Sequence, residues 1–376
     1  MKRFIFAAIA LFFSSFSFAN DRGLDDRINE AFTPIADWWG AVVLHNFPGT
    51  SVPTIIFLLV GGALFFTIYF GFINLRRFPL AINVVRGKFD HVDHQVVDQK
   101  AAVNVVDGGT VDTIKNESKD GEVSHFQALA TAVSGTVGNG NIAGVALAIA
   151  IGGPGATFWM ILCGLIGMST KFVECTLGVK YRDLGEDGTV YGGPMYYLTK
   201  GLKERGFARL GRFLAITFAL LCIGASFGGG NAAQSNQAAM QLVNSFGMDG
   251  GSARTIIGIL MMIFVGIIII GGIKRIASVT EKIVPFMALI YVGACLYIII
   301  TNFSFVDDAF AMIFTQAFNP QAGLGGLLGV LIAGFRRAAF SNEAGAGSAS
   351  IAHSAVKTKF AASEGLVALL EPFIDT

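Results

Sequence analysis

The sequence predicts an all-α polytopic membrane protein with closely packed or interrupted helices, and its composition indicates this class in two ways. Hydrophobic residues make up 53% of the 376 residues and charged residues only 14%, against about 25% charged residues in soluble domains; the mean hydropathy is +0.62. Glycine occurs 47 times, about twice its usual share of roughly 7%. An apolar, glycine-rich chain without a collagen period is typical of membrane helices that pack closely or are broken.

Charge and cysteine content argue against several other classes of protein. The net charge is +1, so we expect no nucleic-acid partner, which would require an excess of basic residues. The four cysteines lie in apolar stretches without a C-x-x-C pair, and we interpret them as small buried hydrophobic residues. The pair His91 and His94 has no second ligand cluster beside it, so we assign it to a solvated linker rather than to a metal site.

The first 19 residues are typical of a signal peptide. Lys2 and Arg3 precede the apolar stretch 4–13, and a small-x-small cleavage site ends at Ala19; these are the three parts of a signal peptide. The alternative is a short first transmembrane helix, but the apolar run is below the roughly 17 residues that a span needs. Residues 20–52 are polar and acidic, and we expect them to form an extracytoplasmic segment.

Seven apolar segments follow, and an eighth begins near residue 365. The seven lie at 53–73, 126–152, 154–179, 211–231, 254–273, 283–301 and 325–343. With the mature N-terminus outside, the cytoplasmic stretches are 74–124, 180–212, 274–282 and 336–359. These stretches hold 21 of the 27 Lys and Arg residues, in agreement with the positive-inside rule. We therefore expect a multi-pass protein of the plasma membrane, which in a bacterium is the inner membrane.

The eighth apolar segment is short. Leu366–Thr376 offers about 11 residues, whereas a helix needs roughly 20 to cross the membrane. We therefore expect the chain to be truncated at its C-terminus, and we expect this fragment alone not to transport.

The second span is interrupted by glycine and asparagine. Ser124 and Gln127 fit a capping box, which marks a helix start, and the sequence Gly135–Asn141 falls in the middle of the span. Three glycines and two asparagines in seven residues are costly in a lipid-facing helix, and irregular backbone at membrane depth lines a cavity or is buried in protein. The alternative is a helix-packing face, which Gly140-x-x-x-Gly144 fits.

Such a break can bind ions without charged side chains. The second half-helix offers N–H groups and the positive end of its dipole to a carboxylate, and the first half-helix ends in C=O groups that suit a small cation such as Na⁺. The sequence Gly138–Ala143 also matches a dinucleotide fingerprint, but no strand precedes it and no acid follows about 20 residues later. No base, nucleophile or metal-ligand constellation lies within a span, so we expect no enzyme.

A second glycine-rich segment at 323–334 predicts a second interrupted helix. It leads into Arg336 and Arg337, about 190 residues after the first break and with four ordinary spans between them. This spacing predicts an inverted five-plus-five repeat, in which the first helices of the two halves share a site near the bilayer midplane.

Two further groups of polar residues have two interpretations each. The patch Phe227–Gln237 carries glycines and amides that either line the substrate cavity or cap a helix end. Lys171 and Glu174 fit either a self-neutralising pair or a proton relay. Glu371 and Asp375, in the eighth segment, remain without an assigned role.

Five short motifs occur in a specific order. They are Ser124–Leu129 (SHFQAL), Gly138–Gly144 (GNGNIAG), Gly152–Gly155 (GGPG), Gly192–Tyr197 (GGPMYY) and Phe340–Gly345 (FSNEAG). From about residue 50 to its end, the sequence resembles the alanine or glycine:cation symporter family. The resemblance implies a LeuT-type inverted-repeat fold with one extra N-terminal helix. It also implies that Na⁺, or in some members H⁺, drives uptake of alanine, glycine or a similar small amino acid, with no cofactor besides the coupling ion.

The resemblance also divides the chain. It implies an accessory helix at 53–73, a cytoplasmic loop at 74–124, a first five-helix repeat at 125–301 and the incomplete start of a second repeat at 302–376. The broken core helices would be 126–152 and 325–343. About three further helices of the family, one of which completes the Na⁺ site with hydroxyls, would be absent.

The site residues implied by the resemblance surround the first break. The amides of Asn139 and Gly140 would hold the substrate carboxylate, and the carbonyls of Ser134 and Val137 would hold Na⁺. The residues expected around the substrate are Gly138, Asn139, Gly140, Asn141, Gln234, Gly329 and Ala333, and those expected around the cation are Ser134, Thr136 and Val137.

Two positions depart from the family pattern. The family usually has Thr at position 139 and Gln or Trp at position 333, where this chain has Asn139 and Ala333. Because both changes alter the volume and polarity of the expected pocket, the identity of the small amino acid stays open. A passive channel, which more often shows a repeated filter or a ring of like charges, and a proton-coupled transporter of another small zwitterion are the alternatives.

Overall fold

The computed structural model describes residues 24–50, 52–89, 121–248, 251–318 and 323–376. The chain divides into two compact units, Met1–Phe57 and Leu58–Thr376, and each is described by itself. The expected signal peptide at 1–19 and the pair His91 and His94 lie outside the described residues.

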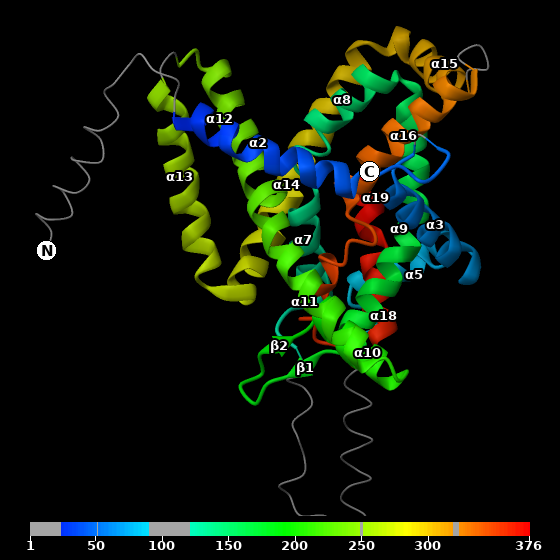
Figure 1. The fold of residues 1–376 in the computed structure, drawn as a ribbon, viewed down its shortest axis with the longest axis vertical. Helices are drawn as coiled ribbons and strands as arrows, with labels where there is room; N and C mark the ends of the chain where they lie inside the picture. The colour runs from blue at the N-terminus through cyan, green and yellow to red at the C-terminus, as the bar shows by residue number, and fades with distance from the viewer. Residues whose placement is uncertain (1–23, 51, 90–120, 249–250, 319–322) are drawn as a thin grey trace, which may run out of the picture. The chain divides into compact units, whose positions relative to one another are not determined.

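The described chain is almost entirely helical (Figure 1). Its first half contains α2 (Leu24–Val43), α3 (Thr54–Tyr69), α4 (Ile73–Arg76), α5 (Phe78–Val85), α7 (His125–Thr136), α8 (Ala143–Gly152), α9 (Gly155–Lys180), the strands β1 (Asp183–Leu184) and β2 (Val190–Tyr191), and α10 (Pro194–Glu204). The second half contains α11 (Ala208–Ala225), the π-helical segment η3 (Ser226–Ala232), α12 (Ala233–Ser245), α13 (Gly251–Ile269), α14 (Gly272–Thr301), the short η4 (Phe303–Phe305), α15 (Val306–Ala317), α16 (Gly323–Asn342), α17 (Ala349–His353), α18 (Ala361–Ala368) and α19 (Leu370–Asp375).

Among the described residues, three helices are long and apolar enough to cross a membrane. They are α9, the continuous helix Ala208–Ser245 and α14. Shorter apolar helices occur at α3, α8 and α13. These helices confirm the prediction of an all-α, multi-pass membrane protein, to which the structure adds the two-residue antiparallel pairing of β1 with β2.

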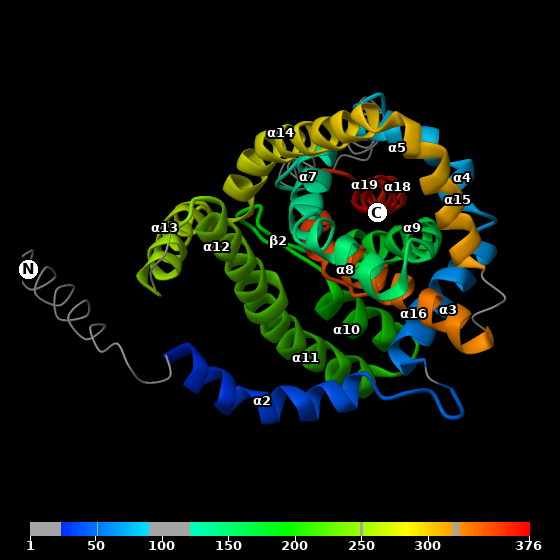
Figure 2. The same ribbon diagram turned by 90° about the horizontal axis from the view of Figure 1, so that it is seen from above.

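Helix α9 is the centre of the larger unit. Of the residues in its apolar window, 56% are buried, against 11% in Ala208–Ser245 and 6% in α14. Helices α8, α16, α18 and α19 lie beside it (Figure 2), and α15 and α17 also pack against it. The other two long helices therefore expose apolar side chains that suit a lipid environment, whereas α9 is covered by protein.

Polar side chains attach α3 and α4 to α9. The hydroxyl of Thr67 donates to the carbonyl of its own helix residue Ala63 at 2.8 Å and lies 3.0 Å from the Ser169 hydroxyl. The Asn74 amide donates to the Leu165 carbonyl at 2.7 Å. Hydrogen bonds between buried polar groups are how membrane helices fix their mutual register, so these contacts hold the predicted accessory helix against the core.

The prediction that the second glycine-rich segment, 323–334, contains a helix break is wrong. Helix α16 runs unbroken from Gly323 to Asn342, and the irregular backbone follows it, at 343–348. Glycine permits a helix as well as a break, and here it serves close packing. A side chain at Gly334 would place its Cβ 2.6 Å from the carbonyl oxygen of Ala156, so only glycine lets α16 approach α9 this closely.

The patch Phe227–Gln237 does not end a helix. The helix continues from α11 through the wider turns of η3 into α12. Single π-helical turns inside α-helices occur frequently at functional sites. The first amide after this segment is Gln234, whose contacts are described below.

The packing of α16 on α9 predicts the effect of enlarging Gly334. We expect Gly334→Val to lower the free energy of unfolding by about 1–3 kcal/mol, the usual cost of overpacking, because the new Cβ would also lie 2.8 Å from Trp159 Cβ. Thermal unfolding of the purified protein in detergent measures this. The matched control is Gly258→Val in α13, where no atom lies within 4 Å of the added Cβ, and its effect should stay below about 0.5 kcal/mol. Equal unfolding temperatures for the two variants would contradict the packing described here.

Candidate functional site

The first predicted break is present. Helix α7 ends at Thr136, Val137 adopts extended backbone, and α8 begins at Ala143. The predicted capping box also forms at the start of α7: the Ser124 hydroxyl accepts from the Gln127 N–H at 3.2 Å, and the Ser124 N–H donates to the Gln127 side chain at 3.1 Å. The segment Val137–Ile142 is therefore a defined connection between two half-helices.

Asn141 organises this connection. Its side-chain oxygen accepts from the Gly138 N–H at 2.7 Å, and its own N–H donates to the Gly138 carbonyl at 3.1 Å. Its side-chain amide donates to a carboxylate oxygen of Asp375 at 2.9 Å. One asparagine thus closes the turn and connects it to α19, because an amide can both accept and donate.

Gln234 covers the other side of the break. Its side-chain oxygen accepts from the Asn139 N–H at 3.1 Å, and its main-chain carbonyl accepts from the Asn139 side chain at 3.3 Å. Gly138 faces it closely, since a Cβ there would lie 3.1 Å from the Gln234 oxygen. The Asn139 N–H, predicted to hold a carboxylate, therefore already binds an oxygen acceptor.

Oxygen atoms of α16 and α19 complete the surroundings of the break. A Cβ at Gly140 would lie 3.3 Å from the Ser341 hydroxyl. Within the described residues, Ser341 Oγ and Asp375 Oδ2 are buried and have no hydrogen-bond partner. A carboxylate and a hydroxyl beside unwound backbone form an oxygen-rich environment, which is the kind of environment that binds small cations in interrupted helices.

Asp375 was left unassigned by the sequence analysis. Its partner Asn141 is 234 residues away in the chain, so no local pattern connects them. The sequence nevertheless contains one indication of its role, because an ionisable residue in an apolar segment by itself indicates function.

The other predicted cation ligands lie on α7 and at its end. Thr136 is buried, with its hydroxyl 3.4 Å from the Val133 carbonyl of its own helix, and Ser134 is exposed and donates to the Thr131 carbonyl at 2.6 Å. Val137 packs against the apolar core cluster that includes Phe172. Ser134 and Thr136 therefore share the turn that precedes the break.

The structure does not bring all the predicted substrate residues together. Ala333 lies against Gly152, at the far end of α8, where a Cβ on that glycine would be 3.0 Å from the Ala333 methyl group. Twelve residues of mostly helical chain separate Gly140 from Gly152, which corresponds to roughly 15 Å or more. Gly329 is exposed, with no atom within 4 Å of an added Cβ. The cluster at the break consists of Gly138, Asn139, Gly140, Asn141 and Gln234, joined by Ser341 and Asp375.

The alternative interpretation of a glycine packing face is also correct for part of the segment. Gly140 faces Ser341, and Gly144 faces the Arg337 guanidinium so closely that a Cβ would overlap it. Both partners belong to α16, so Gly140-x-x-x-Gly144 is a contact surface for α16 as well as part of the break.

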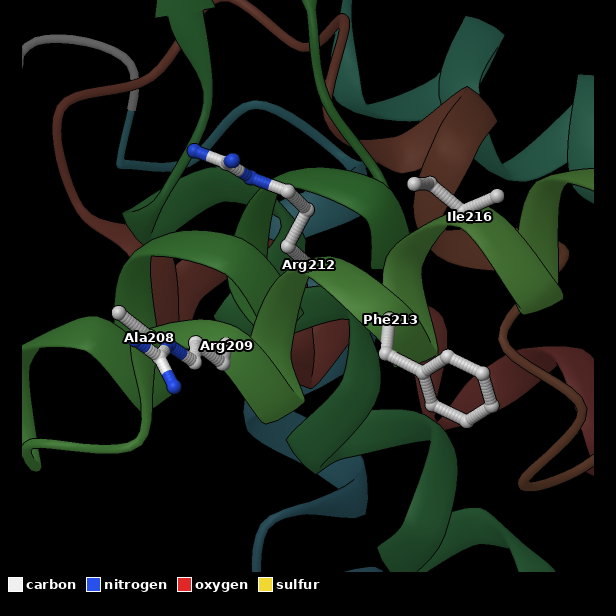
Figure 3. A pocket seen from close by; sticks show the side chains of 5 residues that line it. All are labelled: Ala208, Arg209, Arg212, Phe213 and Ile216. Atoms are coloured by element: carbon white, nitrogen blue, oxygen red, sulfur yellow. The ribbon is translucent and has the colours of Figure 1, made fainter.

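A surface hollow of about 330 Å³ lies elsewhere, near the start of α11. Its lining, shown in Figure 3, consists of Ala208, Arg209, Arg212, Phe213 and Ile216. All five residues belong to one helix and are exposed, and they include none of the residues around the break. We therefore place the candidate site at the break.

In the described part of the chain, no group of three or more His, Cys, Asp and Glu side chains is arranged to hold a metal ion.

Comparison with known proteins identifies similar transporters. The family model described as the sodium:alanine symporter family matches residues 107–376. The sodium/alanine symporter AgcS of Methanococcus maripaludis is 41% identical over 325 residues, which are 86% of this chain and 65% of the relative. The chain thus spans slightly less than two thirds of the length of this relative.

Two relatives from Bacillus subtilis differ in the substrate that their names give. The putative sodium/proton-dependent alanine carrier protein YrbD is 41% identical over 268 residues, covering 71% of this chain and 53% of the relative. The probable sodium/glutamine symporter GlnT is 38% identical over 283 residues, covering 75% and 56%. All three relatives are transporters, not enzymes.

The hydrogen bonds of Asn141 predict the effect of removing its side chain. We expect Asn141→Ala to destabilise the protein by about 1–3 kcal/mol, because it leaves the partly buried Gly138 N–H without an acceptor and removes a donor from Asp375. Thermal unfolding measures the loss, and faster amide hydrogen exchange at 137–142 locates it. The control Asn302→Ala removes an exposed amide at the end of α14 that donates to Ile298 of the same helix at 2.9 Å, and its exchange at 137–142 should match wild type. Wild-type exchange in Asn141→Ala would contradict the role of Asn141.

Proposed function

Because the chain belongs to the sodium:alanine symporter family, we propose that it carries the substrate-binding part of a secondary transporter that imports small neutral amino acids with Na⁺ by alternating access. The observation that best supports this is the break between α7 and α8, with its polar surroundings from α12, α16 and α19. Unwound backbone between half-helices is the usual substrate site of such transporters.

The substrate carboxylate is proposed to bind the N–H groups at the start of α8. In this state the Gln234 oxygen accepts from the Asn139 N–H, and a carboxylate oxygen is a stronger acceptor for the same donor. We propose that the substrate takes over this contact and that Gln234 turns its amide toward the substrate. Gly138 and Gly140 add no side chain that would shield the backbone from the substrate.

The coupling cation is proposed to bind on the opposite side of the break. Ser134, Thr136 and Val137 offer backbone carbonyls at the end of α7, where the helix dipole is negative. Asp375 Oδ2 and Ser341 Oγ are buried oxygens without hydrogen bonds among the described residues. A cation would neutralise Asp375, and Na⁺ is the ion that the family name supports. Protonation of Asp375 is the alternative, and the printed name of YrbD includes both ions.

The proposed architecture is the LeuT-type fold with an accessory helix. In this proposal α3 is the accessory helix, residues 74–124 form a cytoplasmic loop, α7 to α14 within 125–301 form the first five-helix repeat, and 302–376 opens the second repeat. The protein would lie in the plasma membrane with its mature N-terminus outside, which the distribution of Lys and Arg supports.

Transport by the full-length protein in proteoliposomes tests the proposal. We expect accumulation of labelled alanine only under an inward Na⁺ gradient. Gly140→Leu should reduce uptake at least a hundredfold, because a side chain at this position meets Ser341 and fills the break. The control Gly266→Leu, in α13 where no atom lies within 4 Å of an added Cβ, should transport like wild type. Alanine uptake that is independent of Na⁺, or unaffected by Gly140→Leu, would refute the proposed site.

Asn139 is proposed to influence the choice between alanine and larger amino acids. Its side chain fills space beside Gln234 and donates to the Gln234 carbonyl at 3.3 Å. We expect Asn139→Thr, whose shorter side chain gives up the hydrogen bond to the Gln234 carbonyl, to improve competition by glutamine, relative to glycine, by about fivefold, the equivalent of one hydrogen bond of about 1 kcal/mol. Inhibition of labelled alanine uptake by each unlabelled amino acid measures the ratio, with Asn244→Thr on α12 as control. An unchanged ratio would exclude this role.

A further inference from the structure

Six buried ionisable side chains form a continuous row beside the site. We call this row the charge ladder: Glu174, Lys171, Glu371, His353, Glu364 and His125. Along it Lys171 Nζ lies 3.6 Å from Glu174 and 3.1 Å from Glu371, and Glu371 Oε2 lies 3.8 Å from His353 Nε2. Glu364 then binds His353 Nδ1 with one oxygen and His125 Nδ1 with the other. Acidic and basic groups alternate at every step.

The charge ladder joins five separate helices. His125 opens α7, Lys171 and Glu174 belong to α9, and the remaining members lie one each on α17, α18 and α19. Four side chains are 0% exposed, Glu174 is 7% exposed and His125 is 10% exposed. Buried charges persist only when they are paired and hydrogen-bonded, so the packing of these helices depends on the protonation of the ladder.

The geometry around His353 favours an imidazolium. Each ring nitrogen of His353 faces a carboxylate oxygen, Nδ1 toward Glu364 and Nε2 toward Glu371. A neutral imidazole has one N–H and one lone pair, and a lone pair directed at a carboxylate is repelled. Although burial lowers the pKa of His353, its hydrogen bond to Glu364 and the negative charges of Glu364 and Glu371 outweigh this effect and raise the pKa to about 9.

The charge balance assigns a second proton. Three carboxylates face Lys171 and two histidines, so with Lys171 and the three carboxylates all ionised the ladder is neutral when both histidines are protonated. The other titratable groups nearby do not change this count. Cys175 and Tyr197 lie near Glu174, and a thiol and a phenol ordinarily stay neutral at pH 7.

One further carboxylate, that of Asp375, lies close enough to Glu371 and Lys171 to interact with their charges. It also binds Asn141. The other charged neighbours have partners of their own or lie apart from the ladder. Glu281 of α14 binds Gln127 at 2.9 Å. Helix α5, which packs on α18, has no ionisable residue between Phe78 and Val85.

We propose that the charge ladder is a proton-binding site that holds two protons, on His353 and His125, and that their loss loosens α17, α18 and α19 from α7 and α9. The ligand is the proton itself, and His125, as the more exposed histidine, is the entry point. This inference does not depend on the transported substrate or on the coupling ion. It makes the packing of α7, whose other end forms the break, sensitive to pH.

Nitrogen-15 NMR of the histidine rings tests the proton count directly. The chain has five histidines, so the triple variant His45→Gln, His91→Gln and His94→Gln leaves only the two in the ladder. In this variant, labelled with ¹⁵N-histidine and held in detergent, we expect both rings to carry protons on both nitrogens at pH 7.5. Adding Glu364→Gln should leave His353 neutral at that pH, an outcome that a purely structural role would not produce. A neutral ring at either histidine in the triple variant overturns the proposal.

Stability as a function of pH provides a second test that needs no substitution. The raised pKa of His353 contributes stability in full below about pH 6.5, its ordinary value, and the contribution is lost as the pH rises through about 9. We therefore expect the thermal unfolding midpoint of the wild-type protein to fall between pH 6.5 and 9.5. His353→Asn should lower the midpoint at pH 6.5 and reduce its fall with pH by at least half, while His45→Gln should behave like wild type. An unchanged wild-type midpoint over this range overturns the proposal, whether or not His353→Asn folds.

Discussion

The hydrogen-bonding demand of an interrupted helix is the constraint on which the structure around the site depends. Where α7 stops and α8 starts, N–H and C=O groups lose their helical partners, and an apolar environment provides no water to replace them. Asn141, within the break, and Gln234 of α12 accept hydrogen bonds from its N–H groups, and Asp375 of α19 accepts in turn from the Asn141 side chain. The same demand makes the segment useful, because a backbone group that needs a partner will also accept one from a ligand. Stability and binding therefore compete for the same atoms.

The sequence predicts the features that depend on local pattern. The capping box of Ser124 and Gln127 and the break after Thr136 are both present, because caps and runs of Gly and Asn act within a few residues. The second glycine-rich segment misled the prediction, since glycine allows a break but also allows the tight contact of Gly334 with α9. The partners of the break lie 95 and 234 residues away, and no local pattern contains such contacts. Ala333 was grouped with the site by resemblance, but its position against Gly152 follows from helix packing.

For the buried charges, too, the sequence predicts a contact between near neighbours but not the contacts between distant residues. Lys171 and Glu174 were recognisable as an i, i+3 pair, and they do form an ion pair. Their self-neutralisation is incomplete, because Glu371 takes the shorter contact with the lysine. Each of the other acids and histidines looks unremarkable in its own segment. Only the tertiary structure places them in alternating order, and this order, rather than any single residue, determines how many protons the interior can hold.

The wide turns of η3 set the direction in which Gln234 points. A π-helical turn accommodates about one residue more than an α-helical turn, and each residue of an α-helix corresponds to a rotation of about 100°. If the extra residue moved along the helix past Gln234, its side chain would swing by that angle about the axis and leave Asn139. Because Gly228, Gly229 and Gly230 have no side chains to repack, such a slip would disturb few neighbours. The contact of Gln234 with Asn139 therefore depends on where the wide turns lie along the helix.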